Sequence, residues 1–311
     1  MRPMQEHVVR LQNPFWTVDV WPNLGANIGR ILHRPSGQEL LRWPENLTSL
    51  SREPYIFGMP LLFPAGRIEG GVCRVGRELW EWPRNDPAGP NHLHGFLWNR
   101  PFNVKDYSLT HVVLQPAKIT EDLLNRQMHQ PLEITIYYRL IDSRIEMRAR
   151  FVNHGTRPVP FGFGYHVNIS LKTPWEVFLP GGMPWVMGKD LMPRHLAQDE
   201  SQVAELKALP FSVRNLTCDL CYLSCTEDDN TIKLISPDDD SDLQVSISAP
   251  VPFRHWVLYR PNLDADFFSI EPYTWVHNAP NLAMDPRITG MRLLDAQDSI
   301  ETQLSWTCDG N

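Results

Sequence analysis

Two neighbouring stretches of the chain alternate apolar and polar residues with a period of two, LEITIYYRL at 132–140 and RIEMRARFV at 144–152. Because successive side chains of a β-strand point to opposite faces, each stretch places its apolar residues on one face. Asp142 and Ser143 fit a tight turn between them, so the pair predicts an antiparallel hairpin. The apolar residues of the two faces are Leu132, Ile134, Ile136, Tyr138, Leu140, Ile145, Met147, Ala149 and Phe151.

The rest of the chain is divided into short pieces by 28 prolines and 18 glycines. The period of two returns in DLQVSISA at 242–249, whereas helical signals are confined to 120–128 and 199–209. No internal repeat and no linker-like change of composition divides the chain. We therefore predict a mainly β fold, one large antiparallel β-sandwich with a few short helices, as a single domain over residues 1–311.

The charge balance narrows the classes of partner. The chain has 29 basic and 36 acidic residues, a net charge of −7, and no run of basic residues. Nucleic acids and anionic membranes are bound through concentrated positive charge, so we expect neither as a partner. The first residues lack the apolar segment of a secretory signal, and five cysteines, an odd number, fit a reducing compartment. We expect a soluble cytoplasmic protein without a membrane span.

Two histidines two residues apart, His92 and His94 in PNHLHGFLW, suggest a metal pair as in the H-x-H motif of cupin barrels. A strand would point both rings to one face. The glutamate that follows such a pair in cupins is missing here, since Gly95, Phe96 and Leu97 come next. Metal binding is therefore disfavoured, and two hydrogen-bonded histidines in a loop are the favoured interpretation if no other feature converges on this segment.

Two further segments carry possible metal ligands. CDLCYLSC at 218–225 resembles a zinc or iron–sulfur spacing, but the other cysteines, Cys73 and Cys308, are isolated, so buried structural thiols are favoured. The acidic run SPDDDSD at 236–242 lacks the glycine and the terminal glutamate of an EF-hand loop. A solvated turn is the better interpretation there.

Three polar residues interrupt apolar or glycine-rich stretches. His166 lies in FGFGYHVNISL, Glu271 lies in FSIEPYTW, and Arg67 lies in FPAGRIEGG. An unpaired charge is costly to bury, so such residues are usually partnered or functional. No nucleophile elbow, zinc-protease motif or phosphate-binding loop is present. Together with His94, these three residues suggest a pocket.

In these same segments the chain resembles the aldose 1-epimerase (galactose mutarotase-like) family. The resemblance runs almost end to end, and it implies a large antiparallel β-sandwich that interconverts the α and β anomers of an aldose without a cofactor or a metal. The matching segments, in the order that the family has them, are VWPNLGANIGRILHRPSGQELLRW (20–43), FGMPLLFPAGRI (57–68), NHLHGF (91–96), FGFGYH (161–166) and SIEPYT (269–274).

The resemblance also implies the roles of five residues. His166 is expected as the general acid and Glu271 as the general base, with Arg67, His94 and Asp219 binding the sugar. Ring opening needs a base for the C1 hydroxyl proton and an acid for the ring oxygen, and a histidine held partly charged beside a carboxylate suits this. The expected partner is a monosaccharide, a hexose such as galactose or glucose, and the oligomeric state is left open.

The chain departs from the family pattern at two places. Val167, Asn168 and Ile169 replace the proline and aromatic residues that commonly follow the second histidine motif. Relatives that act on hexose 6-phosphates tend to carry an arginine soon after H-G-F, where this chain has Leu97 and Trp98. The nearest arginine, Arg100, lies slightly beyond this place. Because the expected arginine is missing, an unphosphorylated aldose is favoured.

Several alternatives stay open. A hexose-6-phosphate 1-epimerase and a non-catalytic carbohydrate-binding protein would use the same fold. The complete set of His94, His166 and Glu271 counts against the binding protein, which needs no paired acid and base. An apolar face for the sugar ring could come from a tryptophan, with Trp80, Trp82 and Trp98 as the candidates.

Overall fold

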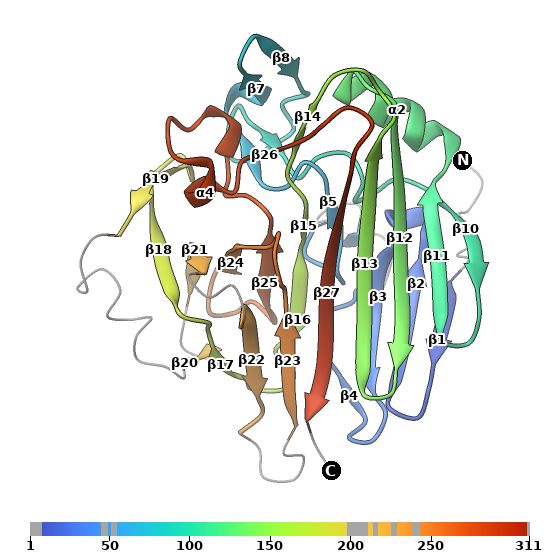
Figure 1. Cartoon of the computed structure of the whole chain (residues 1–311). Helices are drawn as coiled ribbons and strands as arrows, with labels where there is room; N and C mark the ends of the chain where they lie inside the picture. Colours follow the sequence, from blue (N-terminus) through green and yellow to red (C-terminus); the bar gives the residue numbers. More distant parts are fainter. Residues whose placement is uncertain are drawn as a thin grey trace.

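The computed structural model describes residues 8–44, 49–50, 55–197, 211–213, 217–224, 229–237 and 243–309. For residues 211–212, 219–224 and 309 it describes the backbone. The helix predicted at 199–209 and most of the acidic run at 236–242 lie outside these residues. The described elements are mostly antiparallel strands in stacked sheets, so the predicted mainly β sandwich is confirmed (Figure 1).

The predicted hairpin forms the centre of the larger sheet. Over the described residues this sheet has nine strands, which are, in spatial order, β10 (Phe102–Tyr107), β11 (His111–Pro116), β12 (Leu132–Ile141), β13 (Arg144–Asn153), β27 (Ser299–Asp309), β23 (Gln244–Ser248), β22 (Thr231–Ile235), β17 (Glu176–Phe178) and β20 (Phe211–Ser212). Ile136 pairs with Ala149 and Tyr138 with Met147, which confirms the predicted antiparallel register. Figure 1 shows β12, β13 and β27 as adjacent long strands.

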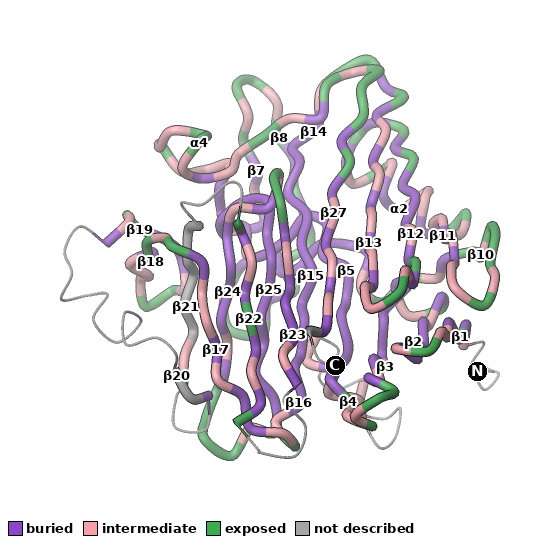
Figure 2. The backbone as a smooth tube through the Cα atoms, turned by 60° about the horizontal axis from the view of Figure 1, so that its bottom comes forward, coloured by how far each residue is buried: buried purple, intermediate pink, exposed green. Residues whose placement is uncertain are grey.

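The second sheet carries the segments that contain Glu271 and His166. Its described strands are, in spatial order, β19 (Pro193–Leu196), β18 (Gly182–Met187), β21 (Cys218–Ser224), β24 (His255–Arg260), β25 (Phe267–Tyr273), β15 (Gly164–Tyr165) and β5 (Leu61–Leu62), with β16 (Val167–Ser170) also paired to β25. All seven residues of β25 are buried. In Figure 2 the buried colour covers β15, β24 and β25, whereas β10 and β11 carry half-buried and exposed residues. β25 is therefore covered on both of its faces.

Smaller sheets complete the described architecture. They are β1 (Val9–Gln12), β2 (Trp16–Trp21), β3 (Asn27–His33) and β4 (Gln38–Glu39) in one sheet, and the pairs β14 (Val159–Phe161) with β26 (Arg292–Leu294), β6 (Arg67–Ile68) with β9 (His92–Leu93), and β7 (Val72–Val75) with β8 (Glu78–Glu81). Most of the buried apolar side chains of the described residues form one continuous cluster, with members in the nine-stranded sheet, in the sheet of β25 and in the sheet of β1 to β4. The assignment of the whole chain to one domain stays a prediction.

Helices play a small part in the described fold. They are α2 (Lys118–Met128), α4 (Pro286–Thr289) and the 3-10 turns η1 (Pro22–Leu24), η2 (Glu69–Gly71) and η5 (Ala279–Asn281). In α2, the buried residues Thr120, Leu124 and Met128 recur every four positions, so one face of the helix packs on the sheet, close to the predicted span of 120–128. In the part of the chain that the structure describes, no helix is both long enough and apolar enough to cross a membrane.

Candidate active site

A cavity of about 300 Å³ opens over β24 and β25. It brings together four of the five residues that the sequence singled out, from positions as far apart as 67 and 271. The described residues that line it are Tyr55, Ile56, Arg67, Asp86, Pro87, Ala88, Leu93, His94, His166, Leu191, Val257, Tyr259, Glu271, Tyr273 and His277. The fifth residue, Asp219, belongs to β21, where its backbone pairs with that of Tyr259, but its side chain lies outside the described residues.

Glu271 and His166 lie next to each other in the wall of this cavity. Glu271 lies in β25 opposite Val257 of β24, and His166 lies between β15 and β16, with its backbone N–H donating to the Pro60 carbonyl. Nε2 of His166 is 3.5 Å from Oε1 of Glu271, and both side chains are almost fully buried. The Tyr273 hydroxyl, two residues further along β25, donates to Oε2 of Glu271 at 2.6 Å. Oε1 is therefore the carboxylate oxygen that faces His166.

Burial decides the charge of the cavity histidines. It lowers the pKa of His166 to about 3, because a charged ring loses its hydration, and the positive charge of Arg67 acts in the same direction. The pKa of His94 also falls well below its usual value, mainly through burial. Burial therefore favours the neutral form of both rings, not the partly charged His166 expected from the sequence.

Arg67 enters the cavity beside a carboxylate that the sequence reasoning missed. Nε of Arg67 donates to Oδ2 of Asp86 at 3.0 Å, and the Asp86 side chain is almost fully buried. The Ala88 backbone N–H and the Asn91 side-chain amide donate to the same carboxylate. Asp86 is thereby fixed, and it holds the guanidinium at the cavity wall.

His94 reaches the cavity through an unusual backbone conformation. Its φ is +60°, so β9 ends at Leu93 and the period of two does not continue through His94. Its ring packs edge-on against those of Tyr55 and His166, with centroid distances of 4.7 Å and 5.3 Å. A non-glycine residue in the left-handed region is strained, and such strain is concentrated at functional sites.

The expectation that His92 and His94 share one face is wrong. The His92 ring packs against Trp82 and Phe96, its Nδ1 contacts the Pro83 carbonyl at 2.7 Å, and it does not line the cavity. The physical reason is the left-handed turn at His94, which reverses the direction of the second ring. Among the described residues, no group of three or more His, Cys, Asp or Glu side chains is arranged to hold a metal ion.

The aromatic residues at the cavity are tyrosines. Trp80 and Trp82 donate their indole N–H groups to backbone carbonyls of α2, and Trp98 packs edge-on against Tyr55. None of the three proposed tryptophans lines the cavity, because each belongs to the packing around it. The described aromatic lining comes from Tyr55, Tyr259 and Tyr273. Arg100 is exposed and does not line the cavity either.

His277 is a second residue of the cavity that the sequence reasoning missed. It follows β25 by four residues, is 2% exposed, and its Nδ1 accepts the backbone N–H of Arg67 at 3.0 Å. A polar pair, His277-Asn278, interrupts the mostly apolar stretch TWVHNAP. This is the same kind of signal that singled out His166, so a search for polar residues in apolar stretches could have found it.

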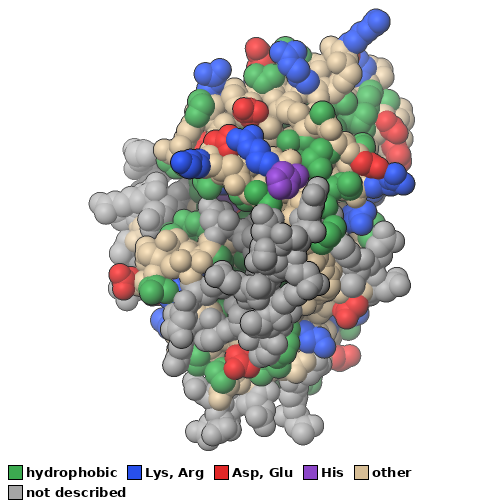
Figure 3. Space-filling model, turned by 90° about the vertical axis from the view of Figure 1, so that its left-hand side faces the viewer, with side chains coloured by type: hydrophobic (Ala, Val, Ile, Leu, Met, Phe, Trp, Pro, Cys, Tyr) green, Lys and Arg blue, Asp and Glu red, His purple; other side chains and the backbone are tan. Residues whose placement is uncertain are grey.

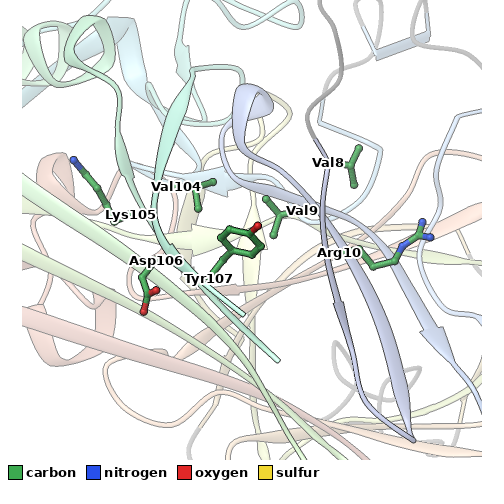
Figure 4. Close-up of a pocket in the computed structure, with 7 residues that line it drawn as sticks. All are labelled: Val8, Val9, Arg10, Val104, Lys105, Asp106 and Tyr107. Carbon is green, nitrogen blue, oxygen red and sulfur yellow. The ribbon is translucent and has the colours of Figure 1, made fainter. Parts of the chain in front are cut away.

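A second hollow, of about 540 Å³, lies between β1 and β10. Figure 4 shows its aromatic member, Tyr107, beside Val104 and Val9. The charged residues that line this hollow are solvated or, like Arg10 with Asp19, held in an ion pair. It has no paired acid and base, so its greater volume does not make it the better candidate. On the face that carries β18 and β19, basic and acidic side chains are interspersed (Figure 3).

Comparisons with known proteins identify the family and the fold of the chain. A family model described as aldose 1-epimerase matches residues 7–305. The fold is similar to that of a galactose mutarotase-like protein from Clostridium acetobutylicum, with a TM-score of 0.86 and 18% identity, over 98% of this chain and 95% of that one.

Two further solved structures share the fold. A putative aldose 1-epimerase from Escherichia coli K12 has a TM-score of 0.77 and 14% identity, over 98% of this chain and 99% of that one. A galactose 1-epimerase from Lactobacillus acidophilus NCFM has a TM-score of 0.72 and 14% identity, over 99% and 96%. These likenesses concern the fold, and the family match over residues 7–305 carries the assignment: the chain belongs to the aldose 1-epimerase family.

Proposed function

We propose that this protein is an aldose 1-epimerase that interconverts the α and β anomers of a free hexose such as galactose or glucose. The observation that carries the proposal is the buried pair of Glu271 and His166, 3.5 Å apart at the wall of the cavity. Ring opening removes the proton of the C1 hydroxyl and adds one to the ring oxygen. Glu271 takes the first proton and His166 supplies the second, so we propose that no cofactor takes part.

The buried setting of the pair favours the ring-opened state. Burial favours a neutral His166, so in this scheme the ring must take up a proton before ring opening. The attraction between the resulting imidazolium and the Glu271 carboxylate offsets part of the cost of burying each charge. After both transfers Glu271 is protonated and His166 is neutral, which is the charge state that burial prefers. Rotation about C1–C2 and the reverse transfers then close the ring on its other face.

The charges of the described lining residues support an unphosphorylated substrate. Arg67 is paired with Asp86, Glu271 adds a negative charge, and burial favours the neutral form of the cavity histidines. The described lining therefore has no surplus positive charge, whereas a sugar phosphate adds about −1.5 to −2 charges at pH 7. We propose that Arg67 and His94 bind the sugar hydroxyls, together with Asp219.

Polarimetry with α-glucose and α-galactose tests the proposal. The parent should accelerate mutarotation, and Glu271→Gln should lower kcat by about 10²–10⁴-fold while sugar affinity changes little. Glu301→Gln, which changes a half-exposed carboxylate of β27, serves as the matched control and should keep full activity. If the parent accelerates only glucose 6-phosphate, the phosphate-specific alternative replaces our proposal. If it binds sugars without accelerating any of them, the protein is a carbohydrate-binding protein.

A further inference from the structure

The tautomer of His277 is fixed by its environment. Its Nδ1 is 3.0 Å from the backbone nitrogen of Arg67, and a backbone N–H can only donate a hydrogen bond. Nδ1 must therefore present its lone pair, and a neutral ring must carry its proton on Nε2. Burial lowers the pKa of His277 to about 3, with the charge of Arg67 adding to this, so the ring is neutral at pH 7.

The ring is also fixed in position. Gly66 has a φ of +74°, and a Cβ atom at this residue would lie 2.3 Å from Nδ1 of His277, so the absence of a side chain lets the ring approach the backbone. The Tyr273 ring packs edge-on against the imidazole from another side, with 5.7 Å between the centroids. Tyr273 is also the residue that holds Glu271. The imidazole therefore has a defined orientation relative to the proposed base.

The remaining N–H group of this ring, at Nε2, has no hydrogen-bond acceptor among the described residues. Nε2 of His277 makes no hydrogen bond to any described residue, although the ring lines the cavity that contains Glu271 and His166. A ring N–H at the wall of a cavity is satisfied when water or a ligand in the cavity accepts from it. We propose that the Nε2–H of His277 donates a hydrogen bond to an oxygen of the bound sugar, as a neutral donor.

This inference rests on the proposed function, since it takes the ligand of the cavity to be a sugar. It assigns to His277 a role that differs from those of His94 and His166. His277 transfers no proton, because its tautomer is held by the Arg67 backbone throughout. It is a binding residue that helps to fix the position of the sugar in the cavity. Loss of its donor should therefore weaken binding more than turnover.

Two matched variants separate the donor role from a structural role. In His277→Asn, the amide oxygen can take the place of Nδ1 and accept from Arg67, but no donor remains at the place of Nε2. In His277→Gln, the amide N–H can reach the place of Nε2, whereas the acceptor for Arg67 is lost. We expect KM for galactose or glucose to rise about 5- to 10-fold in His277→Asn, with kcat within about twofold. His277→Gln should restore part of the affinity, and neither variant should change the pH profile.

Nuclear magnetic resonance provides a readout that does not depend on turnover. In protein with ¹⁵N-labelled histidine, the signals of His277 are those that disappear in His277→Asn. They should report an unprotonated Nδ1 and a protonated Nε2 between pH 5 and 8, and the Nε2–H signal should shift when galactose is added. A KM in His277→Asn equal to that of the parent, or a proton on Nδ1, overturns the inference.

Failure of the proposed function is a separate outcome of these experiments. A parent protein that fails to accelerate mutarotation, but whose Nε2–H signal still shifts with galactose, contradicts the enzyme proposal and supports the role of His277. Equal losses of affinity in both variants, with a lowered unfolding temperature in each, would make His277 a structural residue and also overturn the inference. Saturation-transfer measurements of galactose binding to both variants distinguish these cases when no turnover is available.

Discussion

The hairpin β12–β13 and the cavity over β24 and β25 belong to the same fold but are built in different ways. In the hairpin, apolar residues such as Ile136 and Met147 face the core while every second residue is more exposed, and the strands are joined by a two-residue turn. At the cavity, polar side chains from distant parts of the chain are buried among apolar ones. Arg67 and His277, for example, are joined by a hydrogen bond across 210 residues.

This difference separates the residues that stabilise the fold from the residues that carry the proposed function. The hairpin residues contribute mainly by burying apolar area, so their effect is on the free energy of unfolding. The cavity keeps carboxylates and imidazoles away from water, which costs stability but, in the proposed function, prepares them for proton transfer. We therefore expect substitutions in the hairpin to affect stability, and substitutions at the cavity to affect activity.

The largest effect on stability should come from the hairpin. Ile136 is fully buried, and Ile136→Ala should lower the free energy of unfolding by about 3 kcal/mol, through lost apolar burial and the space left behind. The exposed neighbour Arg139 offers a control, since Arg139→Ala should change stability by no more than about 0.5 kcal/mol. Urea unfolding measures both. A loss of kcat in folded Ile136→Ala protein would show that the two regions are coupled after all.

The sequence predicted the hairpin because its information is local. A period of two and a turn specify which residues of 132–151 face the core, and the register follows from the turn. The same reasoning fails at β25, where all seven residues are buried. Burial on both faces leaves no alternation to detect.

The site could be predicted only in part for a related reason. His166 and Glu271 were found because a polar residue in an apolar strand needs an explanation. Asp86 lies in a loop, and its role depends on Arg67, a contact that no periodic pattern encodes. The direction of the His94 side chain depends on one left-handed φ angle, which cannot be predicted from the sequence HLHGF. The position of such loop residues follows from the tertiary structure rather than from local propensity.

A second prediction concerns the buried histidines. The hairpin, residues 132–153, contains no histidine, so this prediction applies to the other parts of the fold. Burial lowers the pKa of His255 from 6.5 to about 3, and this residue does not line the cavity. The unfolded chain binds its proton below pH 6.5, whereas the folded protein resists it down to about pH 3. Stability is therefore fully present above pH 6.5 and is lost as the pH falls toward 3, by about 2 kcal/mol at pH 5 for this one residue.

Urea unfolding at pH 7 and pH 5 measures this effect. His255→Gln cannot take up the proton, so the difference in unfolding free energy between the two pH values should shrink by about 2 kcal/mol relative to the parent. The exposed His195 provides the control, and His195→Gln should leave the difference as it is in the parent. The same pH dependence in His255→Gln and in the parent would contradict the assignment of this acid sensitivity to buried histidines.

The smallest effect concerns the hydroxyl of Tyr273, which donates to Oε2 of Glu271 at 2.6 Å. A donor to a carboxylate stabilises its charged form, so Tyr273→Phe makes Glu271 easier to protonate. We expect kcat for mutarotation to fall about tenfold, and activity on the acid side to be lost at a higher pH than in the parent. Tyr165→Phe is the matched control, because the buried hydroxyl of Tyr165 makes no hydrogen bond within the described structure. A fall in kcat without any change in the pH profile would mean that Tyr273 acts on something other than the charge of Glu271. Within β25, Tyr273 would then belong with the residues that pack the fold, and Glu271 with the residues proposed to react.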